Sequence, residues 1–296
     1  MPELPEVETT KHSLKPLLGQ TVAAVQVFQP KLRWSVPDDL AKLQGYQLTQ
    51  VQRRAKYLIL TFSKKDDKPL KLLAHLGMSG SLQQHVTSSE PRKHDHIIIN
   101  FTSPEGKQTA LHYHDPRRFG AVLWHHDYQD KLLDHLGVEP LSDEFHADYL
   151  YQTIQKTNST LSNTKKPRPI TKPIKAVIME QQVVVGVGNI YASESLFLTQ
   201  IHPLTPANEL SFEQIAQLTK QIKVILQRAI ELGGSTLRDF TVASGQTGYF
   251  QQTLNVYGNQ GKPCPTCGTT LENIKITGRA SVFCPSCQPL IEQKQL

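Results

Sequence analysis

The sequence predicts an α+β protein, with an antiparallel β-sandwich and an N-terminal helix in the first half and a helical second half that ends in a small metal-binding ribbon. Three observations predict this class. Short β-branched segments alternate with Pro-, Gly- and Asp-rich turns between residues 21 and 123. Apolar residues then recur at helical spacing between residues 174 and 232. All four cysteines fall within the last 33 of the 296 residues.

The first half begins with a helix and continues as strands. Residues 5–18 predict a helix whose apolar side holds Val7, Leu14, Leu17 and Leu18 and which ends at Gly19. Strands are expected at residues 22–28, 57–62 and 96–101, with others in series between them. Several short strands in sequence favour an antiparallel sandwich or barrel.

The second half turns helical after a basic linker. Residues 157–173 contain four basic and no acidic side chains and predict a flexible connection. Short helices are expected at 175–182 and 190–199, and a capping box from Ser211 to Gln214 opens a longer helix that ends at Gly233-Gly234. Residues 235–250 predict a mobile loop. The expected domains are 1–150, a linker at 151–173, 174–255 and 256–296.

Length and composition describe a chain that buries a sizeable core. The hydrophobic content of 38% and charged content of 20% argue against wholesale disorder. No apolar run approaches the roughly 18 residues of a membrane-spanning helix. The acidic opening, Met1 to Glu6, lacks the basic and apolar parts of a secretory signal. We therefore expect a soluble cytoplasmic protein that has no membrane partner.

The charge is divided unevenly between the two halves. Residues 1–150 carry 18 basic and 18 acidic side chains, whereas residues 151–296 carry 14 and 8, so the whole excess of +6 lies in the second half. A neutral half joined to a basic half suggests that the basic half binds a polyanion such as nucleic acid. An ordinary basic surface explains the same numbers equally well.

The cysteines form two C-x2-C pairs separated by 16 residues: Cys264 and Cys267, then Cys284 and Cys287. This spacing is typical of a zinc site with four thiolate ligands on two knuckles, here joined by a hairpin that turns near residues 277–278. Two disulfides are the alternative, but nothing else in the sequence indicates an oxidising compartment. Four thiolates leave no open coordination position, so we expect one structural Zn²⁺.

The N-terminal segment carries the first candidate for chemistry. If Met1 is removed, Pro2 presents a secondary amine, and an α-amino group has a pKa of about 7.7–8.0, well below that of Lys. Such an amine can attack an electrophilic sugar carbon and form an iminium intermediate. Glu3 and Glu6 would supply carboxylates for proton transfer beside it. The alternative is structural, because Pro and Glu both favour the first turn of a helix.

Two loops and two histidine pairs are candidates for nucleic-acid contacts. The segment VGVGN at 185–189 precedes a helix and suits a phosphate, although a plain tight turn explains it too. The segment DPRRFG at 115–120 suits a loop that wedges between bases, or else a salt-bridged turn. For His94 with His96, and His112 with His114, phosphate contacts or a polar strand face are favoured over a metal site.

Together these segments resemble the bacterial formamidopyrimidine-DNA glycosylases along essentially the whole chain. The matching stretches are MPELPEVE at 1–8, RRAKYL at 53–58, HLGMSG at 75–80, KHDH at 93–96, DPRRFG at 115–120 and VGVGNIYASE at 185–194, followed by the four-cysteine ribbon. The resemblance implies a catalytic β-sandwich domain, a helix-two-turn-helix domain and a zinc ribbon, with damaged double-stranded DNA bound across the cleft between domains. It also favours the functional interpretations of Pro2 and of the glycine turn.

The resemblance implies a monomeric, bifunctional glycosylase and AP lyase that flips an oxidised purine, 8-oxoguanine or a formamidopyrimidine, out of the duplex. Pro2 would attack C1′, Glu3 would protonate the sugar oxygen, and Glu6 would assist proton movement. The resulting Schiff base permits β,δ-elimination, in which Lys56 would serve the first step and Arg279 the second.

The same resemblance assigns seven DNA contacts. Met78, Arg117 and Phe119 match residues that fill the space left by the flipped base. The remaining contacts are His94, Lys175, Asn189 and Tyr257.

Three stretches depart from the family pattern. The connection at 158–171 is longer than usual. Asn273 stands where some relatives carry a phosphate-binding Lys, a role that Lys275 would take. The damage-recognition loop, about 235–249, varies among relatives and yields no assignable base contacts.

Three alternatives remain open. Endonuclease VIII has the same architecture and nucleophile but prefers oxidised pyrimidines, and Leu4 together with the wedge residues favours the purine enzyme. A non-catalytic zinc-ribbon protein that binds DNA would explain the basic half but not Pro2 and Glu3. A relative that binds damage without catalysis would be expected to lack a matched catalytic residue, and none is missing.

Overall fold

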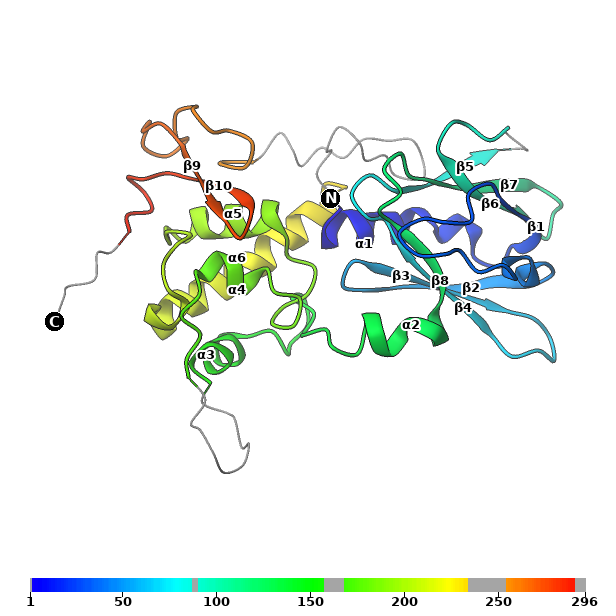
Figure 1. The fold of residues 1–296 in the computed structure, drawn as a ribbon, viewed down its shortest axis with the longest axis horizontal. Coiled ribbons are helices and arrows are strands. Elements are labelled where there is room, and N and C mark those ends of the chain that lie inside the picture. Colours follow the sequence, from blue (N-terminus) through cyan, green and yellow to red (C-terminus); the bar gives the residue numbers. More distant parts are fainter. Residues whose placement is uncertain (1, 87–89, 157–167, 234–253, 291–296) are drawn as a thin grey trace, which may run out of the picture. The chain divides into compact units, whose positions relative to one another are not determined.

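The computed structural model describes residues 2–86, 90–156, 168–233 and 254–290. The chain forms two compact units, one of residues 1–135 with 229–251 and the other of residues 136–228 with 252–296 (Figure 1). No helix in the described part of the chain has the length and apolar character that crossing a bilayer requires. The predicted domain boundaries at 150, 173 and 255 stay predictions.

The first unit opens with helix α1, Leu4–Ser13, and a 3-10 turn, Lys15–Leu17. The expected helix over residues 5–18 is therefore too long. Pro16 lacks the N–H that would continue the α-helical hydrogen bonding, so the last turn tightens. Gly19 then adopts a left-handed conformation at φ 81° and leads into the first strand.

Eight antiparallel strands follow in one hydrogen-bonded series with the order β5-β7-β6-β1-β2-β3-β4-β8. They are β1 Thr21–Val27, β2 Gln47–Arg54, β3 Tyr57–Ser63, β4 Leu70–His75, β5 Ser81–Val86, β6 Asp95–Thr102, β7 Gln108–His114 and β8 Ala121–Trp124. A 3-10 turn, Leu40–Leu43, lies between β1 and β2. The strands predicted at 22–28, 57–62 and 96–101 correspond to β1, β3 and β6.

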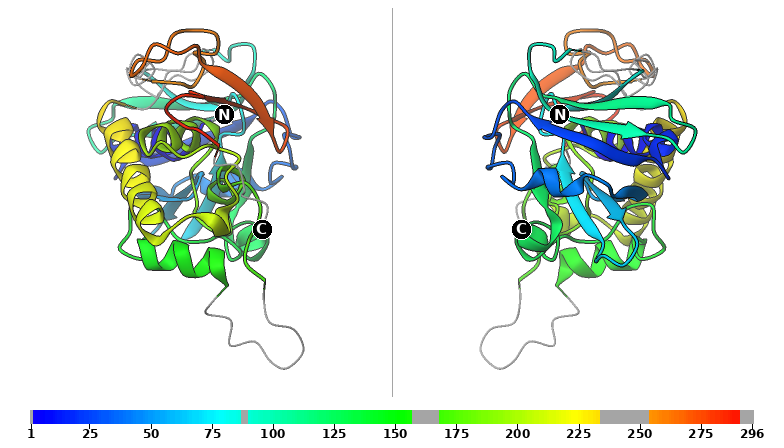
Figure 2. Two further views of the ribbon diagram at one scale, coloured as in Figure 1. Left: turned by 90° about the vertical axis from the view of Figure 1, so that its left-hand side faces the viewer. Right: turned by 90° about the vertical axis from the view of Figure 1, so that its right-hand side faces the viewer.

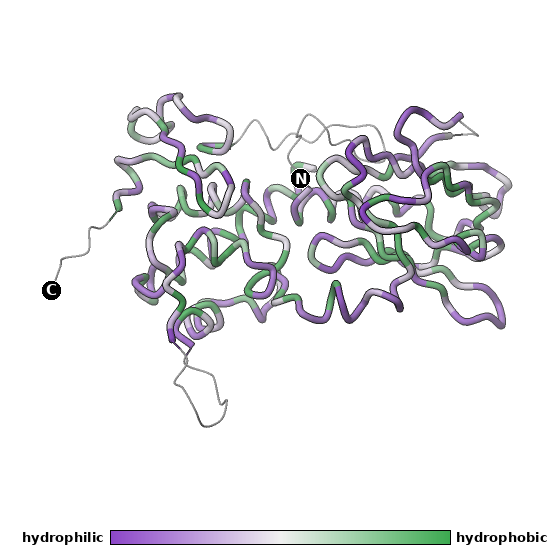
Figure 3. Tube along the Cα trace, in the orientation of Figure 1, coloured by the Kyte–Doolittle hydropathy of each residue, from purple (hydrophilic) through white to green (hydrophobic). Residues whose placement is uncertain are grey.

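The series folds into the predicted sandwich at the junction of β1 and β2. These two strands pair at a single position, Thr21 with Gln47, so the sheet divides there into two four-stranded layers. Figure 2 shows the layers from the end of this unit, and Figure 3 shows the hydrophobic colouring of their strands. A small apolar cavity of about 20 Å³ is lined from both layers, including Leu60 and Leu72 on one and Ile97 and Leu111 on the other. The core therefore lies between the layers.

The second unit is helical, as the periodicity predicts, although the helix expected at 175–182 ends at Ile178. Its helices are α3 Ala147–Gln155, α4 Ile174–Ile178, α5 Asn189–Leu198, the 3-10 turn Ala207–Glu209 and α6 Phe212–Glu231, whose last residues fall in the first unit. Ser211 and Gln214 form the predicted capping box, with bonds of 2.9 and 3.2 Å. The sequence did not predict α3, nor helix α2, His125–Leu132, of the first unit. Helix α2 buries none of its residues and so lacks an apolar period.

The ribbon closes the second unit. Strands β9, Glu272–Ile276, and β10, Arg279–Phe283, pair as the predicted hairpin. Thr277 and Gly278 have φ values of 46° and 80°, as the two central residues of a tight hairpin turn require.

Candidate functional site

The N-terminal segment brings two carboxylates next to Pro2. Glu3 precedes the first residue of α1, and its backbone N–H donates a 2.8 Å hydrogen bond to the Glu6 carboxylate, so the two residues form a capping box. Pro2, Glu3 and Glu6 are all buried. The carboxylates of Glu3 and Glu6 that form the capping box are the same groups that a catalytic role would use. Met1 lies outside the described residues.

Lys56 lies on the tight turn between β2 and β3. Its neighbour Ala55 has a φ of 54°, and the Arg53 guanidinium donates a 3.0 Å bond to the Ala55 carbonyl. Arg53 also donates a 2.7 Å bond to the Glu8 carboxylate on α1. The turn that carries Lys56 is therefore tied to the helix that carries Glu6.

His75, at the end of β4, lies near the Lys56 charge and was not singled out by the sequence analysis, although it begins the HLGMSG stretch. Its ring lies 4.8 Å from that of Tyr57, and its Nδ1 accepts the Gly77 N–H at 3.1 Å. Burial, with smaller contributions from the Lys56 and Arg33 charges, lowers the pKa of His75 to about 4. The imidazole is therefore neutral at pH 7, beside the Lys56 cation.

Two loops at one end of the sandwich carry the predicted wedge residues. Met78 is 39% exposed on the first loop, and Phe119 is 45% exposed on the second. The Arg117 guanidinium lies 4.9 Å from the centre of the Phe119 ring. Gly77, at φ 61°, lets the loops touch, because a Cβ there would lie 2.4 Å from the backbone of Phe119. Large apolar side chains exposed on braced loops suit insertion between bases.

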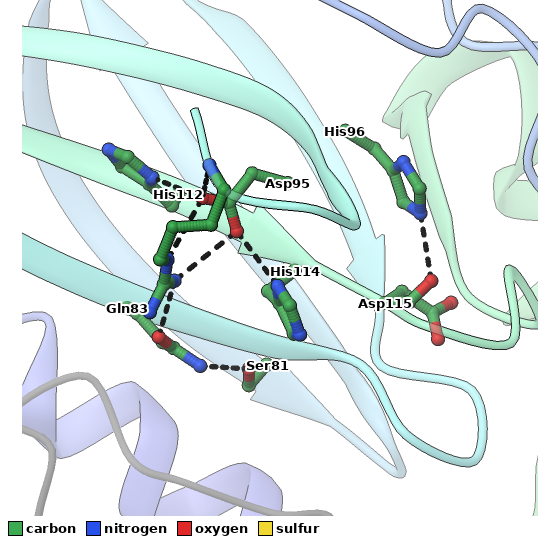
Figure 4. A network of polar contacts seen from close by, with 8 residues as sticks. Ser81, Gln83, Asp95, His96, His112, His114 and Asp115 are labelled. Atoms are coloured by element: carbon green, nitrogen blue, oxygen red, sulfur yellow. Dashed lines mark hydrogen bonds and ion pairs between the residues drawn. The ribbon is translucent and has the colours of Figure 1, made fainter. Parts of the chain in front are cut away.

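His94 precedes β6 and has a φ of 76°, in the left-handed region that non-glycine residues rarely adopt. Its ring lies 6.0 Å from that of His114 and 6.5 Å from that of His96. Figure 4 shows the polar network next to it, which centres on the Asp95 carboxylate.

In the second unit, Asn189 is the first residue of α5, after a glycine turn in which Gly186 has a φ of 80°. Lys175 on α4 is only 1% exposed, and its Nζ donates to Asn189 Oδ1 at 2.8 Å and to Ser281 Oγ at 2.7 Å. The Ala280 carbonyl accepts from Lys175 at 3.3 Å and from Asn189 Nδ2 at 3.0 Å. Lys175 therefore joins α5 to the ribbon hairpin rather than presenting an exposed cation.

Tyr257 is held by a second buried charge. The Glu194 carboxylate on α5 is fully buried and accepts the Tyr257 N–H at 2.8 Å and the Val256 N–H at 2.9 Å. It also accepts from the backbone and side chain of Asn255, each at 2.9 Å. Helix α5 thus positions Asn189 at its N-terminus and the Tyr257 segment along its side.

Arg279 is exposed at the first position of β10, directly after the turn. Asn273 accepts the Ser281 N–H at 3.0 Å and so supports the hairpin, whereas Lys275 is exposed. The loop at 235–249 and most of the basic linker, including Lys165 and Lys166, lie outside the described residues.

The four cysteine sulfur atoms form a metal site. All lie within 4.8 Å of one another, with Cys264 and Cys287 at 3.9 Å and Cys267 and Cys284 at 3.5 Å. Tetrahedral Zn²⁺ with bonds of about 2.3 Å places its sulfur ligands about 3.8 Å apart. The sulfurs are too far apart for disulfides, and the four-thiolate set fits one structural zinc ion. Among the described residues, no other group of three or more potential ligands meets this criterion.

Comparisons with known proteins agree with this geometry. The chain matches the formamidopyrimidine-DNA glycosylase N-terminal domain over residues 1–122, the H2TH domain of the same enzymes over 136–241, and the zinc finger found in FPG and IleRS over 261–290. The formamidopyrimidine-DNA glycosylase of Psychrobacter arcticus is 64% identical, over 98% of this chain and 99% of the relative.

Two solved structures extend the similarity to the fold. The enzyme of Thermus thermophilus is 35% identical, with a TM-score of 0.81 over 98% of this chain and 100% of that one. The Lactococcus lactis enzyme, in complex with DNA containing N7-benzyl-Fapy-dG, is 34% identical, with a TM-score of 0.83 over the same shares. The chain therefore belongs to the formamidopyrimidine-DNA glycosylase family and is a base-excision-repair DNA glycosylase with a structural zinc finger.

Proposed function

We propose that this protein removes oxidised purines from duplex DNA and then cleaves the abasic site through a Schiff base on Pro2. The observation that carries the proposal is the burial of two carboxylates, Glu3 and Glu6, within one helical turn of the Pro2 nitrogen. The capping box explains why acids stand at the helix start, but it does not require that both be buried, because exposed acids favour a helix N-terminus equally well.

The first step is attack on the sugar. The Pro2 nitrogen, freed of Met1, forms a bond to C1′ and gives up its N–H proton, and the bond from C1′ to the base breaks with its electron pair leaving on the base, which takes up one proton in exchange. Glu3 donates a proton to the ring oxygen as the C1′–O4′ bond opens, and the product is an iminium ion. Glu6, bonded to the Glu3 N–H, fixes the segment and assists proton movement.

Elimination follows because the iminium ion makes the 2′ protons acidic. Loss of one 2′ proton breaks the 3′ C–O bond. The conjugated iminium ion that results makes the 4′ proton acidic, and loss of that proton breaks the 5′ C–O bond. We assign phosphate stabilisation in the first elimination to Lys56 and in the second to Arg279. The tie from the Lys56 turn to α1 through Arg53 and Glu8 supports the first assignment.

The remaining residues bind and distort the duplex. Exposed Met78, Arg117 and Phe119 fill the space of the flipped base. Asn189 and Tyr257, held by Lys175 and Glu194, contact phosphates together with His94. We propose that the enzyme acts as a cytoplasmic monomer and that Lys175 positions its neighbours instead of contacting DNA directly.

The test is borohydride trapping on a duplex with 8-oxoguanine opposite cytosine. A covalent protein–DNA band whose adduct maps to Pro2 by peptide mass is the expected result. The matched control is the same chain with Met1 still attached, which should give no band. A thymine glycol duplex run in parallel distinguishes a purine from a pyrimidine enzyme. Absence of trapping on both lesions, with Met1 removed and zinc present, would contradict the proposal.

A further inference from the structure

Three strands of one sandwich layer end in a cluster of imidazoles beside the wedge loops. Asp95 opens β6, His114 closes β7, and Ser81 opens β5, and the three are cross-strand neighbours. The wedge loop with Met78 leads directly into Ser81, and the loop with Arg117 follows directly from His114. A side chain at this end of the layer therefore lies next to the segments proposed to enter DNA.

The Asp95 carboxylate fixes the orientation of His114. Its side chain is fully buried and accepts from the Nδ1 atoms of both His112 and His114 at 2.8 Å (Figure 4). Arg92 adds three further donors, its backbone N–H at 2.9 Å and its guanidinium at 3.1 and 3.2 Å. An ionised carboxylate only accepts, so Nδ1 of His114 carries the proton and Nε2 is the atom left for another partner.

The three other histidines of this layer make contacts within the protein. His112 is fully buried, and His96 is 8% exposed with its Nε2 at 2.8 Å from the Asp115 carbonyl oxygen. His85 packs its ring against that of His112, 4.4 Å away. His85, His94 and His114 are only partly buried, and of these the rings of His94 and His114, next to the wedge loops, lie 6.0 Å apart.

Basic side chains, among them Lys93 and Arg118, surround His94. Desolvation lowers the pKa of His94, and the charges of Lys93, His114, His96 and Arg118 lower it further. The groups that face the cluster are Arg92, Lys93 and His96 from β6 and the segment before it, Gln83 and His85 from β5, His112 from β7, and Asp115 and Arg118 from the loop after it. The two carboxylates near the cluster, those of Asp95 and Asp115, are buried.

The backbone of His94 gives a second observation, independent of the hydrogen bonds around Asp95, that this imidazole has a functional role. A φ of 76° holds its imidazole toward His114 at a cost that ordinary strand geometry would avoid. Strained backbone conformations of this kind cluster at sites that bind a ligand or carry out chemistry.

We propose that His94 and His114 form a paired imidazole site for one DNA backbone phosphate, and that Asp95 positions His114 for this contact. The inference rests on the proposed function, which supplies DNA as the ligand. Binding draws one proton from solvent onto the pair, because the phosphate favours an imidazolium, which desolvation and the neighbouring cations oppose at His94 in the free protein. DNA affinity therefore rises as the pH falls.

The test measures the Kd for a duplex carrying a tetrahydrofuran abasic analogue, which is not cleaved, at constant salt from about pH 8 to about pH 6. One linked proton changes Kd by at most about tenfold per pH unit, so we expect the wild-type protein to bind about three- to tenfold tighter at the lower pH. His114→Asn keeps a donor for Asp95 but removes Nε2 and should lose at least half of this dependence.

The matched control is His126→Asn. His126 also lies beside an aspartate, with its Nε2 3.1 Å from Asp127, but on the exposed helix α2. Its pH dependence should equal that of the wild-type protein. An unchanged dependence in His114→Asn would overturn the inference, and normal borohydride trapping by the same variant would show that the proposed function stands without it.

A wild-type measurement keeps the test independent of the fold of any variant. The protonated fraction of the His94 imidazole, followed by NMR at a fixed pH, should rise when the abasic duplex binds. A fraction that stays constant on binding would also overturn the inference. Failure of the wild-type protein both to bind and to be trapped would instead contradict the proposed function.

Discussion

The Ser79 hydroxyl donates a 2.8 Å hydrogen bond to the fully buried Asp115 carboxylate and so joins the two wedge loops. The same carboxylate accepts the Gly120 N–H at 2.8 Å and the Arg117 N–H at 3.3 Å. Asp115 therefore closes its own loop and fastens it to the neighbouring one that carries Met78. Two loops fixed to one anion move as a unit, which pre-organises their exposed side chains before DNA is bound.

We predict that Ser79→Ala impairs base extrusion more than strand cleavage. The substitution removes one donor from a buried carboxylate, a loss of about 1.5–3 kcal/mol in stability. A looser wedge should slow excision of 8-oxoguanine, whereas a preformed abasic site has no base to extrude and should be cleaved at nearly the wild-type rate. Single-turnover rates on the two duplexes give the comparison.

Ser103→Ala is the control for this prediction. Ser103 donates a bond of the same 2.8 Å length to Glu105, but on an exposed turn. The Ser103→Ala variant should keep the wild-type rates on both duplexes and the wild-type melting temperature, because exposed polar pairs contribute little to stability. Equal losses on the two substrates in Ser79→Ala would argue against a role for this bond in extrusion.

The periodic parts of the fold could be predicted from the sequence because burial of one face decides them. Strands β3 and β6 alternate with turn formers, and α6 has both a capping box and an apolar stripe. Helix α2 could not be found in this way, since none of its residues is buried. Pro16 should have shortened the first helix, but the apolar Leu17 and Leu18 continued its pattern.

The candidate site could be predicted where the functional residues are close together in the sequence, as in the two cysteine pairs. Pro2 and Glu3 were candidates by residue type, but a helix start was the alternative, and only the resemblance favoured the catalytic interpretation. The bracing residues could not be predicted, because their partners are distant in sequence. Asp115 meets Ser79 across 36 positions, and Lys175 meets Ser281 across 106. Lys175 was expected at the DNA, but burial turns its cation toward the protein.

We predict that Lys175→Met weakens DNA binding through Asn189 and the ribbon hairpin. Removing the ammonium leaves Asn189 Oδ1 and Ser281 Oγ without this donor, and each unsatisfied buried polar group costs about 1–3 kcal/mol. We therefore expect a lower melting temperature and a Kd for abasic-site DNA that is weaker by about tenfold or more. Calorimetry and fluorescence anisotropy measure the two effects.

Lys172→Met provides the comparison, because Lys172 lies three positions away and pairs with Glu180 on the surface. A surface pair of this kind contributes about 0–1 kcal/mol, so this variant should melt like the wild-type protein. If the two variants changed affinity equally, loss of general positive charge would explain both, and the positioning role of Lys175 would be wrong.

We predict that removing zinc unfolds the ribbon but spares the sandwich. Cys264 and Cys284 belong to a small apolar cluster with Leu271, Val282 and Phe197, which is too small to fold without the metal. The protein as purified should contain about one zinc per chain by elemental analysis. A chelator should abolish DNA binding, while the strand signal in circular dichroism persists. Retention of DNA affinity after verified zinc loss would contradict this prediction.

Finally, we predict that His75 makes the first unit less stable in mild acid. Its pKa is about 4 in the folded protein against 6.5 for an ordinary histidine, so the unfolded chain binds the proton more readily. Above pH 6.5 the imidazole is neutral in both states and does not change the free energy of unfolding. This free energy falls as the pH drops from 6.5 toward 4, by at most about 1.4 kcal/mol per pH unit.

His75→Gln cannot titrate, so its urea midpoint should change less over this range, while its amide oxygen can still accept the Gly77 N–H. His146→Gln, an exposed histidine 55% accessible on the second unit, should keep the full wild-type slope. If His75→Gln also kept the full wild-type pH dependence of the urea midpoint, the acid sensitivity would come from another group. Burial would then not be what keeps the imidazole beside Lys56 neutral.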